Sequence, residues 1–418
     1  MRRPAKDFTL IYLDHHATTP LDPEVLSAML PLLTEHFANS GSVTHEAGRA
    51  VAELLERAQH ELALLLGGSS DELVITSGAT ESNNLALFGA CLHPRQKRRK
   101  IVSLVSEHRA VLDPLRRLES MGFEVVLLPV CDRYCEVPGQ VLLDRLRSTI
   151  DDNTALVSVM LANNEIGTIQ PLRAIAELCH ARGSLLHSDA TQAVGRMPLK
   201  VDDLNVDLMS FSAHKFYGPK GVGGLYVRSR GRRVRLQAQI VGGGQQQNLR
   251  SGTLNSAGLV GMTAALRKCY QLNGWHARPG EMGVEEKRVA GLRERMFVGL
   301  KTALEAIQLN GPCLQRPGLQ MPEGSSDLTR LAGNLNLCFY PIEGQSLMLE
   351  IPSVAMSSGS ACTSADPQPS HVLEAIGLSV EESRSSLRFG LGRFNTEQEI
   401  DTATELLITA AHKLRKLM

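Results

Sequence analysis

The chain has 418 residues, a hydrophobic share of 43% and equal numbers of acidic and basic side chains, which is typical of a globular protein of about two or three domains. Its formal net charge of zero argues against a general nucleic-acid or membrane-surface binder. The start of the chain lacks the apolar core of a secretory signal, and no stretch approaches the roughly 18 apolar residues of a membrane span.

Segments with helical and strand patterns alternate through the first part of the chain. A helix is expected around 22–36, and another over 45–68, which ends at a pair of glycines. Strands are then expected at 72–76, 100–105, 124–128, 155–161, 184–189, 207–212 and 223–228. Because helical patterns separate most of these strands, we predict an α/β fold with a mostly parallel, buried, seven-stranded sheet.

The rest of the chain predicts a smaller α+β domain. The pattern is helical from 256 to 306, and two strands and a helix follow at 333–339, 385–392 and 396–417. We expect an N-terminal segment over 1–20, a large domain over 21–265 and a small domain over 266–418. The N-terminal segment and the helix around 22–36 are expected to pack with the small domain.

Polar residues follow several of the predicted strands, where ligands bind in sheets of this kind. The turn that begins with Ser77 offers backbone amides and hydroxyls to a phosphate, although a simple helix cap also fits. Asp189 ends one strand and could pair with a protonated pyridine nitrogen or be purely structural. Lys215 ends the next strand, and a lysine in a closed pocket can form a Schiff base.

These residue types are those that pyridoxal phosphate (PLP) requires. Lys215 would hold the aldehyde, and Asp189 would keep the ring nitrogen protonated so that the ring accepts electrons from the substrate Cα. Gln192 could hydrogen-bond the ring 3-oxygen. The remaining candidates could bind the phosphate: Thr80, Ser212 and His214.

The eight cysteines form no C-x-x-C pair. Cys131 and Cys135 are the closest, but no nearby histidine completes a zinc pattern. Cys362 lies in the run "MSSGSACTSADPQP" (356–369), where small residues favour a mobile loop with an accessible thiol. We expect free thiols, a reducing cytoplasmic compartment and no resident metal.

Motifs along nearly the whole chain resemble the NifS/IscS-type cysteine desulfurases, which are fold-type I PLP-dependent transferases. The motifs are "YLDHHATTP" (12–20), "TSGATESNN" (76–84), "SEHRAVLD" (106–113), "NNEIGTIQP" (163–171), "HSDATQAVG" (187–195), "SAHKFYGPKGVGGLYVR" (212–228), "LRSGTLN" (249–255), "SSGSACTSA" (357–365) and "SSLRFGLGRF" (385–394).

The resemblance implies a role for each matching residue. Lys215 is the Schiff-base lysine and proton carrier, His108 is a catalytic residue that stacks on the cofactor ring and assists in acid–base steps, and Cys362 accepts the sulfur of L-cysteine. The implied cofactor residues are Ala79, Thr80, Asn164, Asp189, Gln192, Ser212, His214, Lys215 and, from the second subunit of a homodimer, Thr253. The implied substrate residues are Asn39, Asn164 and Arg388.

The resemblance also implies partners for the sulfur transfer, and three alternative functions remain open. The sulfur would pass to an Fe–S scaffold or another acceptor protein, and Cys362 could transiently share an Fe–S cluster with that scaffold. An aminotransferase would use Lys215 and Asp189 without Cys362, whereas a selenocysteine lyase would use the same site. A non-catalytic sulfur carrier would bind no chromophore.

Overall fold

The computed structural model describes residues 10–275, 282–314, 329–358 and 369–417. Its largest sheet has seven strands: β2 (Leu73–Thr76), β3 (Lys100–Leu104), β4 (Glu124–Leu128), β5 (Thr154–Ser158), β6 (Leu185–Asp189), β7 (Leu208–Ser212) and β8 (Gly223–Val227). The strand order is β2-β8-β7-β6-β5-β3-β4, and β8 alone runs antiparallel to its neighbours in this sheet. The predicted mostly parallel sheet of seven strands is confirmed.

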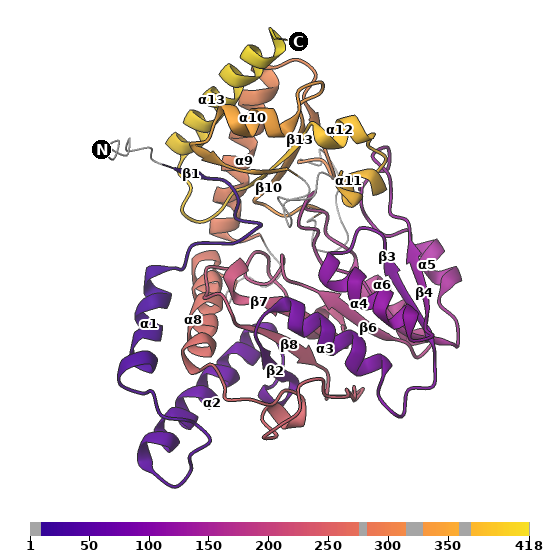
Figure 1. The fold of residues 1–418 in the computed structure, drawn as a ribbon, viewed down its shortest axis with the longest axis vertical. Helices are drawn as coiled ribbons and strands as arrows, with labels where there is room; N and C mark the ends of the chain where they lie inside the picture. The colour runs from indigo at the N-terminus through magenta and orange to yellow at the C-terminus, as the bar shows by residue number, and fades with distance from the viewer. Residues whose placement is uncertain (1–9, 276–281, 315–328, 359–368, 418) are drawn as a thin grey trace.

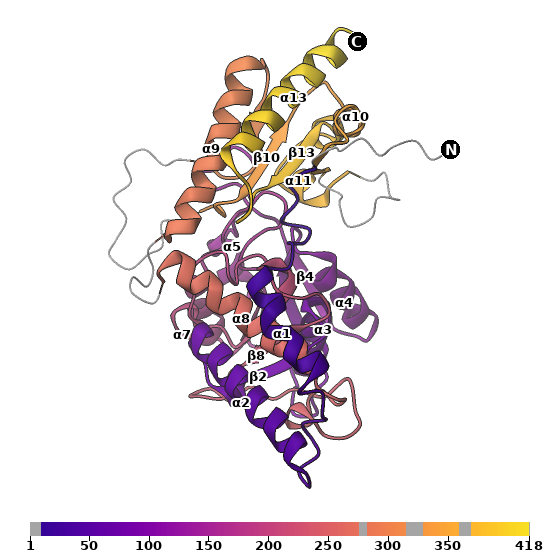
Figure 2. The same cartoon turned by 90° about the vertical axis from the view of Figure 1, so that its left-hand side faces the viewer.

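Helices cover both faces of this sheet (Figures 1 and 2). Side chains alternate along each strand: Ile75 and Val102 join one apolar core, whereas Val74 and Ile101 join another on the opposite face. The helices on the first face are α2 (Glu46–Leu66), α5 (Leu143–Thr149), α6 (Leu172–Ala181), α7 (Val201–Leu204) and α8 (Ser256–Asn273). Those on the second face are α3 (Ala79–Cys91) and α4 (Arg109–Ser120).

A smaller α+β unit lies above the large sheet in Figure 1. Its antiparallel sheet contains β9 (Gln308–Leu309), β10 (Asn334–Cys338), β12 (Ser357–Ser358) and β13 (Ser386–Gly390), in the order β12-β13-β10-β9. The helices of this unit are α9 (Val284–Ala303), α10 (Gly344–Glu350), α11 (His371–Ala375), α12 (Val380–Arg384) and α13 (Glu397–Arg415). Leu335 and Leu387 pack with Met296 and Leu407 in its core.

The N-terminal residues divide between the two units. Strand β1 (Ile11–Tyr12) pairs with β11 (Val354–Ala355), and Ile11 belongs to the core of the small unit. Helix α1 (Pro23–Thr34) instead packs against α8, where a side chain at Gly261 would meet Met29 within 2.6 Å. The expectation that this helix packs with the small domain is therefore wrong, because its apolar side fits the glycine-lined surface of α8.

The helical stretch expected over 256–306 consists of two separate helices. Helix α8 ends at Gly274, whose φ of 67° lies in the left-handed region that favours glycine. The expected division after residue 265 falls inside α8, and Cys269 and Tyr270 beyond it still belong to the core of the large unit. Among the described residues, no helix is both long and apolar enough to cross a bilayer.

Candidate active site

A cavity of about 520 Å³ opens at the carboxyl ends of β5, β6 and β7. A cavity of this size is in the usual range for a bound cofactor or small ligand. Most of the residues predicted for the site line it together: Ala79, Thr80, His108, Asn164, Asp189, Gln192, Ser212, His214, Lys215 and Arg388.

Lys215 enters the cavity from a short turn directly after β7. Its Nζ donates hydrogen bonds to the carbonyl oxygens of His16 and Ala17, each at 2.7 Å. The guanidinium of half-buried Arg196 donates to the carbonyl oxygen of Lys215 from Nε at 3.1 Å and from Nη2 at 2.9 Å. The lysine is therefore fixed at its main chain and at its amine.

Asp189 and Gln192 form the wall that follows β6. Asp189 is only 5% exposed, and its carboxylate accepts hydrogen bonds from the amide of Asn83 at 2.7 Å and from the backbone N–H of Thr191 at 2.9 Å. The Gln192 amide donates to the carbonyl oxygen of His16 at 2.9 Å, and its Oε1 lies 2.9 Å from the His16 Nδ1. These contacts hold a negative and a neutral polar group at fixed positions in the wall.

The first turn of α3 forms the end of the cavity suited to an anion. Gly78 precedes it with a φ of 150°, and the helix begins with the backbone amides of Ala79 and Thr80, which have no carbonyl partner within the helix. Burial, followed by the charge of Lys215, lowers the pKa of His214 to about 4. His214 is therefore neutral at neutral pH, and its Nδ1 lies 3.0 Å from the Thr18 hydroxyl.

Arg388 brings the small unit into the cavity. It lies on β13, is 3% exposed, and binds Asp14 at 2.8 Å and the carbonyl oxygen of Asn164 at 3.1 Å. Its Nε has no hydrogen-bond partner among the described residues. A buried guanidinium with an unused donor is suited to a carboxylate ligand.

Two predicted residues do not line the cavity of this chain, and the position of a third is not described. Asn39 lies in an exposed loop, where its side chain accepts a hydrogen bond from the N–H of Gly41 at 2.9 Å. Thr253 is also exposed, in the segment before α8. Cys362 lies outside the described residues.

The structure adds residues to which the sequence-based prediction assigned no role. His16 and Asn83 contact the predicted cavity residues, while Asp14 and Arg196 hold Arg388 and Lys215 from behind. Asp14, His16 and Asn83 lie inside the motifs "YLDHHATTP" and "TSGATESNN". These motifs could therefore have identified the three residues as candidates from the sequence. The role of Arg196 depends on a long-range contact that no motif predicts.

The donor set fits PLP. The cavity combines a primary amine at Lys215, a buried carboxylate at Asp189 and a helix N-terminus at Ala79. These groups match an aldehyde, a pyridinium nitrogen and a phosphate, respectively. These three groups come from separate elements of the fold, and all of them line the same cavity.

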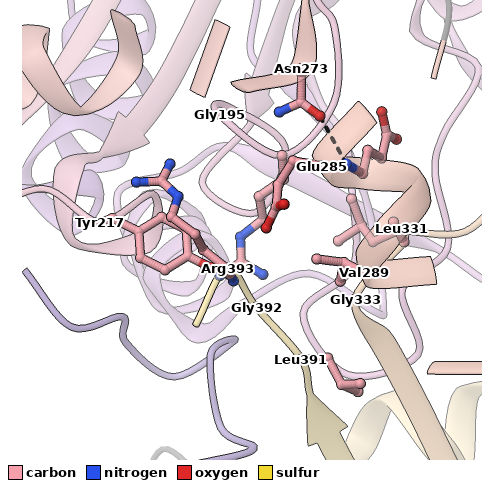
Figure 3. A pocket seen from close by; sticks show the side chains of 13 residues that line it. Gly195, Tyr217, Asn273, Glu285, Val289, Leu331, Gly333, Leu391, Gly392 and Arg393 are labelled. Atoms are coloured by element: carbon pink, nitrogen blue, oxygen red, sulfur yellow. Dashed lines mark hydrogen bonds between the residues drawn. The ribbon is translucent and has the colours of Figure 1, made fainter. Parts of the chain in front are cut away.

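A second and much smaller cavity lies between the two units (Figure 3). It measures about 60 Å³, which is enough for a few water molecules only. Arg393 lies over the ring of Tyr217, with 4.1 Å between its Cζ and the ring centroid, and Asn273 accepts a hydrogen bond from the N–H of Glu286 at 2.9 Å. This cavity is too small for an amino acid and a cofactor, so it is not the candidate active site.

Comparison with known proteins decides the family. Residues 11–308 match the family model described as aminotransferase class-V. The chain belongs to the class-V aminotransferase family. Within this family it is 46% identical to the cysteine desulfurase IscS of Anaeromyxobacter sp. strain Fw109-5, over 97% of this chain and 94% of that protein. It is 42% identical to the probable mitochondrial cysteine desulfurase of Dictyostelium discoideum, over 97% and 84%.

Comparison with solved structures agrees with this family assignment. A NifS-like protein superposes with a TM-score of 0.82 at 32% identity, over 97% of this chain and 99% of the other. SspA, solved in complex with cysteine, superposes with a TM-score of 0.75 at 30% identity, over 92% and 100%. The predicted fold-type I architecture and the resemblance to NifS/IscS-type proteins are confirmed.

Proposed function

We propose that the protein is a PLP-dependent cysteine desulfurase, which converts L-cysteine to L-alanine and retains the sulfur as a persulfide on Cys362. The observation that carries this proposal is the convergence of Lys215, Asp189 and Arg388 in one cavity. The cysteine desulfurase names of full-length relatives and the cysteine complex of SspA support it.

The cavity residues divide into cofactor and substrate groups. Asp189 and Gln192 would hold the pyridine ring, His108 would stack on it, and Asn164 would lie beside it. The phosphate would bind at the first turn of α3, with Ala79, Thr80, Ser212 and His214. When bound, PLP supplies an electron sink for the substrate Cα.

Arg388 and Lys215 act on the amino acid itself. The guanidinium of Arg388 binds the substrate carboxylate, and its ion pair with Asp14 fixes the orientation of the planar group. The Lys215 amine removes the proton from Cα and returns a proton to the product. The carbonyl oxygens of His16 and Ala17 lie within hydrogen-bond distance of this amine and orient it.

Cys362 completes the reaction as the sulfur acceptor. Its thiolate attacks the substrate sulfur, an S–S bond forms, the Cβ–S bond breaks, and Cβ gains a proton to give alanine. One L-cysteine and one enzyme thiol thus give one L-alanine and one enzyme persulfide, with no external oxidant.

The segment that carries Cys362 is attached to the cavity wall at both ends. On the N-terminal side, Ser357 lies opposite Arg388 in the pairing of β12 and β13. On the C-terminal side, the His371 Nε2 lies 2.9 Å from the carbonyl oxygen of Glu107, next to His108. Cys362 is four residues after Ser358 in the sequence, and four steps of about 3.5 Å each limit its distance from Ser358 to about 14 Å.

The test is alanine release from L-cysteine by the PLP-loaded protein. Wild type is expected to form alanine and to gain about 32 Da on the Cys362 peptide, the mass of one sulfur. Cys362→Ser should keep the visible absorbance of lysine-bound PLP but lose both products. Lys215→Ala should lose that absorbance, and its alanine formation should fall about a thousandfold.

Cys313→Ser is the matched control, because Cys313 is an exposed thiol outside the cavity. This variant should behave as wild type. Undiminished alanine release by Cys362→Ser would show that another thiol or direct elimination performs the chemistry, and the proposed role of Cys362 would be wrong.

We further propose a homodimer in which Thr253 completes the partner's site. Support comes from the exposure of Thr253 in the single chain and from apolar side chains exposed on and after α1. The sulfur would pass to an Fe–S scaffold or another acceptor protein. A reducing cytoplasm suits this transfer, and the seven cysteines in the described part of the chain are all free.

A further inference from the structure

An acidic side chain lies at the end of the cavity that is suited to an anion. Glu81 is the third residue of α3, and it lines the cavity together with Ala79 and Thr80. Among the described residues that line this cavity, two are acidic, Glu81 and Asp189. A pyridinium nitrogen would match the charge of Asp189, whereas a phosphate would be repelled by the charge of Glu81. The binding of a phosphate at this turn therefore does not by itself explain Glu81.

Helix capping accounts for one carboxylate oxygen of Glu81. Its Oε2 accepts a hydrogen bond at 2.8 Å from the N–H of Ser77, which precedes the helix. Glutamine serves in this capping position as glutamate does, because the cap needs only an acceptor oxygen. The cap therefore does not require a negative charge beside the anion site.

Arg250 binds the same carboxylate from a segment that is distant in the sequence. Its Nε donates to the Glu81 Oε1 at 2.8 Å, and its Nη2 donates to the Glu81 Oε2 at 3.4 Å. The side chains of Arg250 and Glu81 are 22% and 16% exposed, so solvent screens this ion pair only in part. Although burial raises it, hydrogen bonds from Arg250 and Ser77 hold the pKa of Glu81 below its ordinary value. Glu81 is therefore ionised at neutral pH, and one guanidinium balances its charge.

Hydrogen bonds on either side of Arg250 fix the segment that carries it. The N–H of Ser251 donates to the carbonyl oxygen of Ile240 at 3.0 Å. The N–H of Gly252 donates to the side-chain oxygen of Gln245 at 2.8 Å. Arg250 therefore reaches α3 from a defined position and does not behave as a mobile surface arginine.

We propose, on the basis of the proposed function, that Arg250 neutralises Glu81 and thereby sets the affinity of the cavity for the cofactor phosphate. With Arg250 in place, the backbone amides of Ala79 and Thr80 bind the phosphate without a competing negative charge. Without Arg250, the Glu81 carboxylate repels the doubly charged anion in a half-buried site, where such repulsion is strong. Arg250 acts through Glu81 and needs no contact of its own with the phosphate, so it is a positioning residue.

The test compares the binding of PLP with that of pyridoxal, which lacks the phosphate. Both are titrated into the cofactor-free full chain and followed by the absorbance of the lysine-bound form. Arg250→Gln should weaken PLP binding at least about tenfold and leave pyridoxal binding unchanged. Glu81→Gln keeps the capping oxygen, and it should bind PLP at least as tightly as wild type.

The double variant Glu81→Gln/Arg250→Gln distinguishes neutralisation from a direct contact. It should bind PLP within about threefold of wild type, because the repelling charge is removed together with its partner. Arg295→Gln is the matched control, since Arg295 binds Asp401 through the same two guanidinium nitrogens, at 2.6 and 2.8 Å, away from the cavity. This variant should bind both compounds as wild type does.

A double variant as weak as Arg250→Gln would overturn the proposal, because Arg250 would then contact the phosphate itself or fix the nearby Thr253. Wild-type PLP binding by Arg250→Gln, or an equal loss of PLP and pyridoxal binding, would overturn it as well. Failure of the wild-type chain to bind PLP would instead overturn the proposed function and this role of Arg250 together. The two failures are therefore distinguishable.

Discussion

A single buried histidine connects three strands below the cavity. His187 lies on β6, and its two ring nitrogens are 2.9 Å from the Ser158 hydroxyl on β5 and 3.0 Å from the Ser210 hydroxyl on β7. Burial lowers the pKa of His187 to about 4, although the charge of Asp189 opposes this shift. The ring is therefore neutral at neutral pH and serves as a structural hydrogen-bonding group.

The lowered pKa of His187 predicts that this one residue makes the stability of the fold depend on pH. The unfolded chain binds a proton at His187 near pH 6.5, whereas the folded chain binds it only near pH 4. The stabilisation is thus complete above pH 6.5 and is lost as the pH falls toward 4. Between pH 7 and pH 5 the loss amounts to about 2 kcal/mol.

His187→Asn should remove this contribution, so its free energy of unfolding should change less between pH 7 and pH 5 than that of wild type. Urea unfolding at the two pH values measures the difference. The control is His412→Asn, at an exposed position of α13, which should follow wild type. An equal pH dependence in wild type and His187→Asn would contradict the prediction.

At the scale of elements, helix α11 joins the small unit to the wall of the cavity. Its cap residue Ser370 accepts hydrogen bonds from the N–H groups of Val372 and Leu373, both at 3.2 Å. The same hydroxyl donates to the carboxyl of buried Glu165 at 2.5 Å. One side chain therefore both begins the helix and fixes it to the large unit.

We expect Ser370→Ala to destabilise α11 by about 1–2 kcal/mol, because the cap is lost and the buried Glu165 carboxyl loses its partner. Hydrogen exchange over residues 371–384 should become faster. Alanine formation should also fall, while the absorbance of lysine-bound PLP stays unchanged, since the cofactor residues are untouched.

Ser379→Ala is the matched control for this helix. Ser379 caps α12 through the N–H of Glu382 at 3.2 Å, but it is exposed and lies away from the cavity. Its variant should open α12 locally and leave alanine formation near the wild-type value. Similar losses of activity in both variants would show that helix stability alone, and not the contact with Glu165, matters.

At the scale of the whole molecule, an apolar surface lies on and after α1. Leu26, Leu30 and Leu33 are exposed on this helix, and Phe37 beyond it is 75% exposed. Exposed apolar groups of this number are typical of a protein–protein interface, and this surface supports the proposed homodimer.

Leu33→Asp and Phe37→Asp should therefore weaken dimerisation at least about tenfold, since a charge would be buried without a partner. Light scattering over a dilution series measures the dissociation. Leu349→Asp is the control, because Leu349 is 81% exposed on α10 in the small unit. Dimers that dissociate equally in all three variants would place the interface elsewhere.

A mixing experiment tests the shared site. Heterodimers of a Lys215→Ala chain and a Thr253→Ala chain contain one site with both residues intact if Thr253 acts in the neighbouring subunit. Activity should then exceed that of either parent. No gain on mixing would place Thr253 outside the partner's site.

The sequence by itself determined the sheet and the type of chemistry. Alternation and helical spacing are local patterns, so the seven strands were predicted within a few residues of their observed bounds. Asp189 ends β6 and Lys215 follows the adjacent strand β7, and parallel strands bring their carboxyl ends to one edge. The family motifs then related these residues to PLP and L-cysteine.

Only the tertiary structure decided how those residues are held and which segments meet. His16 contacts Gln192 across 176 residues of sequence, and Arg196 fixes the lysine turn. Helix α1 lies on α8 because Met29 fits over Gly261, while Asn39 lies outside the cavity of this chain. These outcomes depend on the complementary shapes and hydrogen bonds of segments that are distant in sequence, which no local pattern encodes.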